Sequence, residues 1–417
     1  MTALSFEILQ RSNRCGARLG RVTTLHGGFD TPAFMPVGTK GSVKGLFPAT
    51  VRGTGAQILL NNTYHLLLRP GPELVSAMGG VHRFMNWDGP ILTDSGGYQA
   101  FSLADMNSVD DEGVTFKSIV DGKMIRMTPE EATRVQNLLG ADIIMAFDDC
   151  PPSAPLTDTT AASESDPLLT RAMVRDSGKK GYDHEKRLDV ALERTARWLQ
   201  RCKDAHSRPG EQSLFGIVQG GTDLARRSTS AEQICNIELP GYAIGGVAVG
   251  ETSGDIARVV RHTAPLLPDH KPRYLMGVGY ERDILAAVLS GVDMFDCVLP
   301  TRNGRNANAF TRHGQIRLRN AQYSEDPAAI DSDCDCYACA PHLHGWTGSA
   351  GFSRSYIRHL FMAGEMLGPI LVSIHNLRHF QRLMLDIRSA LRKDCWIDFA
   401  ARWPVACPGF PDGFLRG

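Results

Sequence analysis

The segment DIIMAFDD, residues 142–149, is a short apolar run that ends in two aspartates. Further apolar runs of similar length occur along the chain at 31–37, 56–62, 89–95, 214–220, 242–248, 274–279 and 294–300. Apolar runs without a polar face are typical of parallel strands covered on both sides, and segments with helical periodicity separate them. Eight such runs predict an α/β fold, a (β/α)8 TIM barrel.

The helical segments between and after these runs carry recognisable boundaries. Thr128, Pro129 and Glu131 form a capping box with proline in the first turn, and this helix is expected to end at Gly140. Residues 187–204 place apolar side chains on one helical face, as do residues 370–391. We therefore expect long amphipathic helices in both places.

Two segments interrupt the alternation of strands and helices. Residues 154–186 are rich in Ser, Thr, Asp and Lys without a sustained period, which predicts a surface insertion. Residues 301–365 combine glycines, arginines and clustered cysteines, and are expected to form a small metal-binding subdomain inserted after the eighth strand. The barrel is accordingly assigned to 1–300, and 366–417 is expected to supply C-terminal helices that complete it and a tail.

The composition, with 42% apolar and 22% charged residues in 417, is that of a globular protein. The chain shows neither a signal-peptide pattern nor an apolar run long enough to span a membrane, so we expect a cytoplasmic protein without membrane contact. Its ten cysteines are too sparse for a disulfide scaffold.

The formal net charge is zero, but the charge is unevenly distributed. Residues 297–324 contain no Asp or Glu and five arginines: Arg302, Arg305, Arg312, Arg317 and Arg319. A local basic segment on a neutral protein predicts a specific anionic contact surface, and a solvated loop is the alternative.

Polar residues stand at the ends of the predicted strands. Asp94 and Asp148 each end an apolar run, and Asp296 lies inside the apolar MFDCVLP. The loops at one end of a barrel surround a shared mouth, so these carboxylates are expected to meet there. One such aspartate alone is commonly a cap or turn former. Three on different strand ends favour a pocket that binds a donor-rich base and acts on its sugar.

The cysteines Cys334, Cys336 and Cys339 form a Cys-x-Cys-x-x-Cys pattern. Thiols so close in sequence are poorly placed for ordinary disulfides, and a fourth ligand would close a tetrahedral zinc site. This pattern predicts bound metal.

Several motifs together carry a family resemblance. They are DSGGYQ (94–99), FDDC (147–150), FGIVQGG (215–221), GGVAVGE (245–251), LMGVG (275–279), MFDCVLPTRNGRN (294–306) and CDCYAC (334–339). In this order, over nearly the whole chain, they resemble the tRNA-guanine transglycosylase (queuine tRNA-ribosyltransferase) family of bacterial type. The resemblance implies a pentosyltransferase that exchanges guanine at the anticodon wobble position for 7-aminomethyl-7-deazaguanine.

The resemblance also implies roles for the strand-end residues. Asp296 would be the nucleophile that attacks the anomeric carbon, leaving a covalent aspartyl-RNA intermediate. Asp94 would be the acid/base residue that manages the proton on the base. The set expected to bind the base comprises Asp94, Ser95, Gly96, Gly97, Tyr98, Asp148, Gln219, the backbone N–H of Gly246, and Met276.

Two segments would contact RNA by the same resemblance. One is Thr301, Arg302, Asn303, Gly304 and Arg305. The other is Gly277, Val278, Gly279, Tyr280, Glu281, Arg282 and Asp283. The implied partners are the Asp, Asn, His and Tyr tRNAs with a GUN anticodon, and the family resemblance also leads us to expect a homodimer.

The resemblance makes His375 the fourth ligand of one structural Zn2+ per subunit. The stretch from Cys339 to His375 is longer than is usual in the family, because 341–351 looks inserted. His342, His344 and His379 are therefore rival ligands.

Cys150 and Val249 resemble the bacterial pocket, which favours the deazaguanine substrate. A non-catalytic RNA-binding paralogue and a barrel glycoside hydrolase are the competing hypotheses. The first would be expected to lose Asp94 or Asp296, and the second has no use for the Arg-rich segment or the cysteines.

Overall fold

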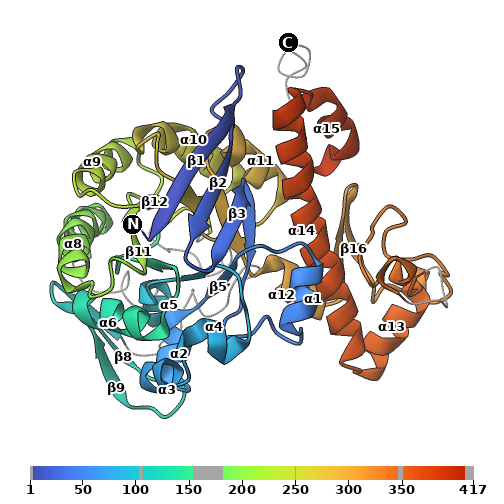
Figure 1. The fold of residues 1–417 in the computed structure, drawn as a ribbon, viewed down its shortest axis with the longest axis horizontal. Helices are drawn as coiled ribbons and strands as arrows, with labels where there is room; N and C mark the ends of the chain where they lie inside the picture. The colour runs from blue at the N-terminus through green and yellow to red at the C-terminus, as the bar shows by residue number, and fades with distance from the viewer. Residues whose placement is uncertain (1–2, 103–106, 154–181, 249, 346–350, 409–417) are drawn as a thin grey trace.

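The centre of the computed structural model is an eight-stranded parallel sheet in the order β4-β14-β13-β12-β11-β10-β6-β5 (Figure 1). Its strands are β4 (Ala33–Pro36), β5 (Leu59–Asn61), β6 (Ile91–Thr93), β10 (Ile143–Met145), β11 (Ser213–Val218), β12 (Gly241–Ile244), β13 (Arg273–Leu275) and β14 (Met294–Cys297). A parallel bridge between Val37 and Leu60 joins the two edges of this sheet. Each strand overlaps one of the predicted runs, so the predicted barrel is confirmed.

The structure describes residues 3–102, 107–153, 182–248, 250–345 and 351–408. Most of the predicted insertion 154–186, part of the insertion 341–351, and Val249 lie outside these residues. Within them, no helix combines the length and the apolar character needed to cross a membrane.

The helices are α1 (Pro48–Gly53), α2 (Thr63–Leu68), α3 (Pro72–Ala77), α4 (Gly80–Met85), α5 (Gly97–Ser102), α6 (Pro129–Leu139), α8 (His184–Ala205), α9 (Leu224–Cys235), α10 (Ser253–Thr263), α11 (Glu281–Leu289), α12 (Leu299–Arg305), α13 (Arg354–Ala363), α14 (Leu367–Lys393) and α15 (Trp396–Arg402). The predicted boundaries of α6 are confirmed, because the Thr128 side chain accepts from the Glu131 N–H and Gly140 ends the helix at φ +77°. Helices α8 and α14 contain the two predicted amphipathic segments.

Three antiparallel sheets accompany the barrel and were not predicted. They consist of β1 (Leu4–Arg11), β2 (Arg18–Thr24) and β3 (Gly27–Thr31); β7 (Asn107–Asp110), β8 (Gly113–Lys117) and β9 (Met124–Met127); and the hairpin β15 (Asn308–Thr311) with β16 (Gly314–Arg317). The first sheet pairs side chains of alternating burial and packs its apolar face on the barrel core, through Leu4, Val22 and Phe29.

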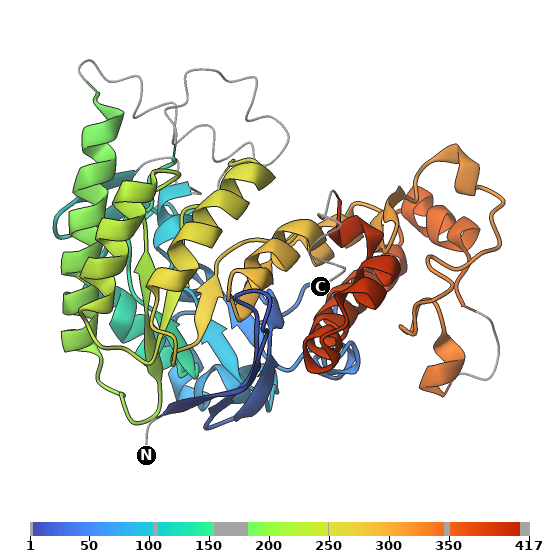
Figure 2. The ribbon, with the colours of Figure 1, turned by 90° about the horizontal axis from the view of Figure 1, so that it is seen from above.

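Helix α14 runs between the barrel and the segment that carries β15, β16 and α13 (Figures 1 and 2). Its side chains are buried on several faces, because it packs against α12, β15 and α13 as well as against β4. Asn376 illustrates the connection, since its amide donates to the carbonyls of Pro300 and Asn308 at 2.9 and 3.0 Å. This helix therefore fixes the position of the metal-binding segment relative to the barrel.

A His–Asp–His cluster lies at the amino end of the barrel strands. Asp142, just before β10, is buried and accepts from His26 Nδ1 and His82 Nε2, each at 2.9 Å. The two imidazole rings are stacked with centroids 3.6 Å apart. Because His26 lies in the turn between β2 and β3, the cluster ties the first antiparallel sheet to the barrel.

This cluster predicts a pH-dependent contribution to stability. The hydrogen bond from His26 to Asp142 raises the pKa of His26 above the usual 6.5. The stabilisation by His26 is therefore complete below pH 6.5 and is lost as the pH rises through the folded-state pKa. The pKa of Asp142 is lowered by its histidine partners despite its burial, so its contribution is lost only in acid. We expect His26→Ala to lower the free energy of unfolding more at about pH 6 than at about pH 9 in chemical denaturation. The exposed control His313→Ala should change neither value, and an equal loss at both pH values would contradict this role.

Candidate active site and metal cluster

A cavity of about 210 Å³ opens at the carboxyl end of the barrel. Most of the residues predicted to bind the base line it: Asp94, Ser95, Tyr98, Asp148, Gln219, Gly246, Met276 and, with them, Asp296. Tyr98 lies on α5, and the others come from β14 or from the loops that follow β6, β10, β11, β12 and β13. The cavity is of the size that suits a single small ligand such as a nucleobase.

Asp94 is held by a ring of hydrogen-bond donors. The backbone N–H of Thr63 donates to its Oδ1 at 2.8 Å, and the side chains of Asn62 and Gln99 donate to its Oδ2. Burial raises the pKa of Asp94 to about 6, against the lowering effect of these donors and with a further increase from the charge of Asp296. A carboxyl with this pKa exchanges a proton readily near neutral pH.

Asp148 is buried beside Gln219 and Ser95. Gln219 Nε2 donates to Oδ2 at 2.6 Å, and Ser95 Oγ donates to Oδ1 at 3.2 Å. Burial raises the pKa of Asp148 to about 6 even though both donors favour the charged form. The carboxylate is thus fixed in orientation while it remains an acceptor for a ligand's N–H groups.

Asp296 is oriented through one oxygen. Tyr274 Oη and the backbone N–H of Gly277 both donate to Oδ1, at 2.6 and 2.8 Å. Oδ2 accepts no hydrogen bond from the part of the chain that the structure describes. Burial raises the pKa of Asp296. The arrangement holds the carboxylate in place and leaves one oxygen available for bond formation.

Glycines allow the close packing of these groups. Gly246 has φ +62°, and a Cβ there would overlap the carboxamide of Gln219. A Cβ on Gly97 would lie only 3.1 Å from the carbonyl oxygen of Asp148. Gly96 and Gly97 do not line the cavity themselves, and they serve to bring its walls together.

Asn62, Gln99 and Tyr274 also belong to the site, although none of them was predicted as a site residue. Asn62 ends the predicted strand 56–62, Gln99 ends the motif DSGGYQ, and Tyr274 begins the predicted strand 274–279. Only the folded geometry shows that each donates to a site aspartate, because the donor and acceptor lie on different strands or loops.

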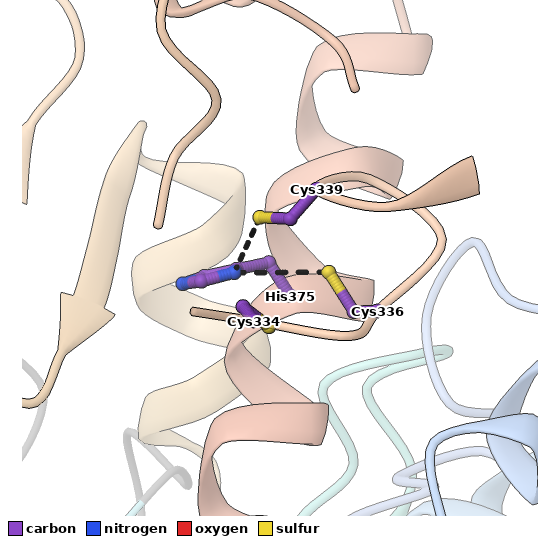
Figure 3. Close-up of side chains that lie close together, drawn as sticks. All are labelled: Cys334, Cys336, Cys339 and His375. Atoms are coloured by element: carbon purple, nitrogen blue, oxygen red, sulfur yellow. Dashed lines mark hydrogen bonds between the residues drawn. The ribbon is translucent and has the colours of Figure 1, made fainter. Parts of the chain in front are cut away.

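The structure brings Cys334, Cys336, Cys339 and His375 together (Figure 3). All four are buried, and their ligand atoms lie within 4.8 Å of one another. His375 Nδ1 lies 3.3 Å from Cys339 Sγ, and its Nε2 donates to the carbonyl of Phe310 at 2.7 Å. That second hydrogen bond sets the ring orientation and tautomer, as is usual for a metal-binding histidine. The cluster can therefore hold a metal ion.

The rival histidines are used elsewhere. His379 Nε2 pairs with the buried Glu281 at 2.7 Å. His344 contacts the carbonyl of Asp335, and His342 is exposed. Arg378, one turn along α14 from His375, makes two hydrogen bonds to Asp335 at 2.8 and 2.6 Å and so anchors the cysteine loop.

The arginine-rich segment begins directly after the strand of Asp296. Within the described ranges, Arg302 and Arg305 on α12 form no ion pair, and neither do Arg317 and Arg319 around β16. Arg312 differs, because it pairs with Asp386 at 3.6 Å. Four of the five arginines thus keep their charge available to an external anion.

The segment 277–283, whose last three residues begin α11, contains both buried and exposed side chains. Glu281 and Asp283 are only 3% and 5% exposed, so their carboxylates support α11 and its neighbours. Tyr280 is 40% exposed, and the Arg282 guanidinium lies over its ring at 5.8 Å. Of the side chains predicted to contact RNA in this loop, these two are the ones at the surface.

Comparison with known proteins accords with this geometry. A family model described as queuine tRNA-ribosyltransferase matches residues 13–166 and 171–407. A protein of that name from Acetivibrio thermocellus is 48% identical over 399 residues, which cover 96% of both chains. Those from Synechococcus elongatus and Thermus thermophilus are 46% and 48% identical, over 99% and 96% of this chain and 98% and 93% of their own. On this match, over nearly its full length, the chain belongs to the queuine tRNA-ribosyltransferase family.

Proposed function

We propose that the protein is a tRNA-guanine transglycosylase that replaces guanine at the wobble position with 7-aminomethyl-7-deazaguanine by double displacement. Its RNA substrates would be the Asp, Asn, His and Tyr tRNAs with a GUN anticodon. The observation that carries the proposal is the set of three carboxylates around one nucleobase-sized cavity, in which Asp296 keeps a free oxygen.

Base recognition follows from the donors and acceptors of the cavity. The ionised Asp148 would accept from the ring N–H and amino group of a guanine-like base, and Gln219 and the Gly246 N–H would donate to its carbonyl. Tyr98 and Met276 line the same cavity and would cover the faces of the flipped base. Cys150 also lines it, as expected for the bacterial type.

The reaction would proceed in two balanced displacements. Asp296 Oδ2 bonds to the anomeric carbon as the glycosidic C–N bond breaks, and the bonding pair leaves with guanine, which takes a proton from Asp94. The incoming base then gives its ring proton to Asp94 and attacks the same carbon, which releases Asp296. A pKa of about 6 suits Asp94 to both directions of proton transfer.

The unpaired arginines define the RNA-binding surface of this proposal. Arg302 and Arg305 lie on the helix that follows the strand of Asp296, and they form no ion pair with the described residues. Tyr280 and Arg282 lie where the loop after β13 meets α11, and Arg282 also donates to Ser253 Oγ at 3.0 Å. Guanidinium groups that form no ion pair within the protein are free to bind phosphates on either side of a flipped nucleotide.

The cysteine cluster would hold one structural Zn2+ per subunit. Three thiolates and one imidazole are the ligand set that zinc prefers, and four protein ligands leave no open position for chemistry. Because His375 also binds the carbonyl of Phe310 in β15, the metal would brace the arginine-rich segment against α14.

The ten free cysteines accord with the expected cytoplasmic setting. The exposed Tyr356 and Met362 of α13 offer a surface for the expected homodimer.

The first test is exchange of radiolabelled guanine into unmodified tRNA. We expect incorporation by the wild type, and at least about 10³-fold less by Asp296→Asn, because the amide is a much weaker nucleophile. Asp88→Asn, at a side chain 90% exposed, is the matched control and should retain full activity. No incorporation by the wild type would instead favour the non-catalytic paralogue.

Metal analysis tests the zinc site. Cys339→Ser should lower bound zinc from one ion per chain to a small fraction and lower the melting temperature, because the remaining ligands cannot close the tetrahedron. Cys235→Ser, at a cysteine outside the cluster, should keep full occupancy. Full zinc stoichiometry in Cys339→Ser would mean that the ligands are wrongly assigned.

A further inference from the structure

Arg227 of α9 is a fully buried cation beside the base pocket. Its Nε donates to the carbonyl of Gly221 at 2.8 Å, and its Nη1 donates to those of Val218 and Gly245 at 2.9 and 2.8 Å. Its Nη2 donates to the carbonyl of Gly246 at 3.1 Å. No carboxylate in the described part of the chain forms an ion pair with it. Burial lowers its pKa to about 10, so it remains charged at neutral pH.

Burying a guanidinium without an ion pair is costly, and here four hydrogen bonds to backbone carbonyls offset part of that cost. The Val218 carbonyl ends β11, and the other three belong to the loops after β11 and β12, which also carry Gln219 and Gly246. The loop after β11 lies close against α9, since Gly220 has φ +129° and a Cβ there would lie 2.9 Å from the backbone nitrogen of Arg227. Arg227 thus ties together the two loops that form one wall of the cavity.

The hydrogen bond from Arg227 to the Gly245 carbonyl also fixes the orientation of the Gly245–Gly246 peptide, because the peptide is planar and trans. The C=O and N–H of one peptide point in opposite directions. Arg227 holds the carbonyl of Gly245, so the N–H of Gly246 in the same peptide points away from the arginine. Both glycines line the cavity. A cation bound at the carbonyl also polarises the peptide, which makes its N–H a stronger donor.

We propose that Arg227 is a positioning residue for base recognition, which orients and polarises the Gly245–Gly246 peptide so that the Gly246 N–H donates to the carbonyl of the bound base. This inference rests on the proposed function. It goes further because it assigns part of the specificity for a carbonyl-bearing base to a residue that does not touch the base.

A purely structural role makes a different prediction, so the test needs a readout of specificity. Guanine and 6-thioguanine share the ring N–H and amino group that Asp148 would bind, but sulfur is a much weaker acceptor than the carbonyl oxygen. Their dissociation constants, measured by calorimetry, give the preference of the site for the carbonyl. Guanine exchange by the wild type is measured separately and tests the proposed function itself.

We expect Arg227→Met to reduce the preference for guanine over 6-thioguanine by about tenfold, because the Gly246 N–H would no longer be oriented and polarised by the guanidinium. Arg227→Lys keeps the charge but cannot span the four carbonyls, so it should lose part of the preference and is the variant more apt to fold. The control is Arg388→Met, at another buried arginine with a pKa of about 10, which donates to the carbonyl of Pro32 at the amino end of β4.

Melting temperatures identify variants that are folded under assay conditions. The control should lose stability and keep the wild-type preference for guanine. Folded Arg227 variants that also keep the wild-type preference would overturn the proposal and leave the arginine a structural role only. A wild type that binds guanine but does not exchange it would refute the proposed function, and the guanine preference of the variants would still decide whether Arg227 positions the base.

Discussion

Closure of the barrel is the constraint on which the site depends. In the strand order, β6 lies next to one edge of the sheet and β14 next to the other, so an open sheet would hold Asp94 and Asp296 far apart. The bridge between Val37 and Leu60 joins those edges, and both of these residues line the cavity. The proposed acid/base residue and nucleophile therefore face one pocket only because the sheet closes between them.

The same closure supplies the electrostatic setting. The barrel removes water from three carboxyl groups, which raises the pKa of each, and donors from neighbouring loops hold each group in one orientation. In the proposed reaction, Asp148 would be ionised and would accept hydrogen bonds from the base, whereas Asp94 would gain and lose a proton. Both have a pKa of about 6, so their different roles follow from what each faces rather than from their acidity.

The barrel and most of the pocket residues could be predicted from the sequence because both produce local sequence patterns. Buried parallel strands appear as continuous apolar runs, and the aspartates that end them stand out as polar residues. The three antiparallel sheets were not predicted, because their strands are not continuous apolar runs; β1, LSFEILQR, alternates more and less buried side chains instead. The pairing of these strands also depends on their turns and partner strands, which apolar runs do not predict.

Individual side-chain roles depended on tertiary structure. In α9 the adjacent Arg226 and Arg227 are indistinguishable by sequence, yet the first binds Asp189 and Glu185 near the surface and the second is wholly buried. Glu281 lay in a segment predicted to contact RNA, and its carboxylate is buried against His379, a residue considered as a zinc ligand. In both cases the helix face that packs inward decided the role.

Peptide mapping of the trapped intermediate would show whether Asp296 becomes covalently bonded to RNA, as the proposed double displacement requires. The protein would be incubated with a guanine-containing anticodon stem-loop, denatured during turnover, digested with protease and nuclease, and analysed by mass spectrometry. If Asp296 is the nucleophile, we expect a ribose-linked mass on the peptide that contains Asp296 and none on the peptide that contains Asp94. A modified Asp94 peptide, or active exchange with no modified peptide, would contradict it.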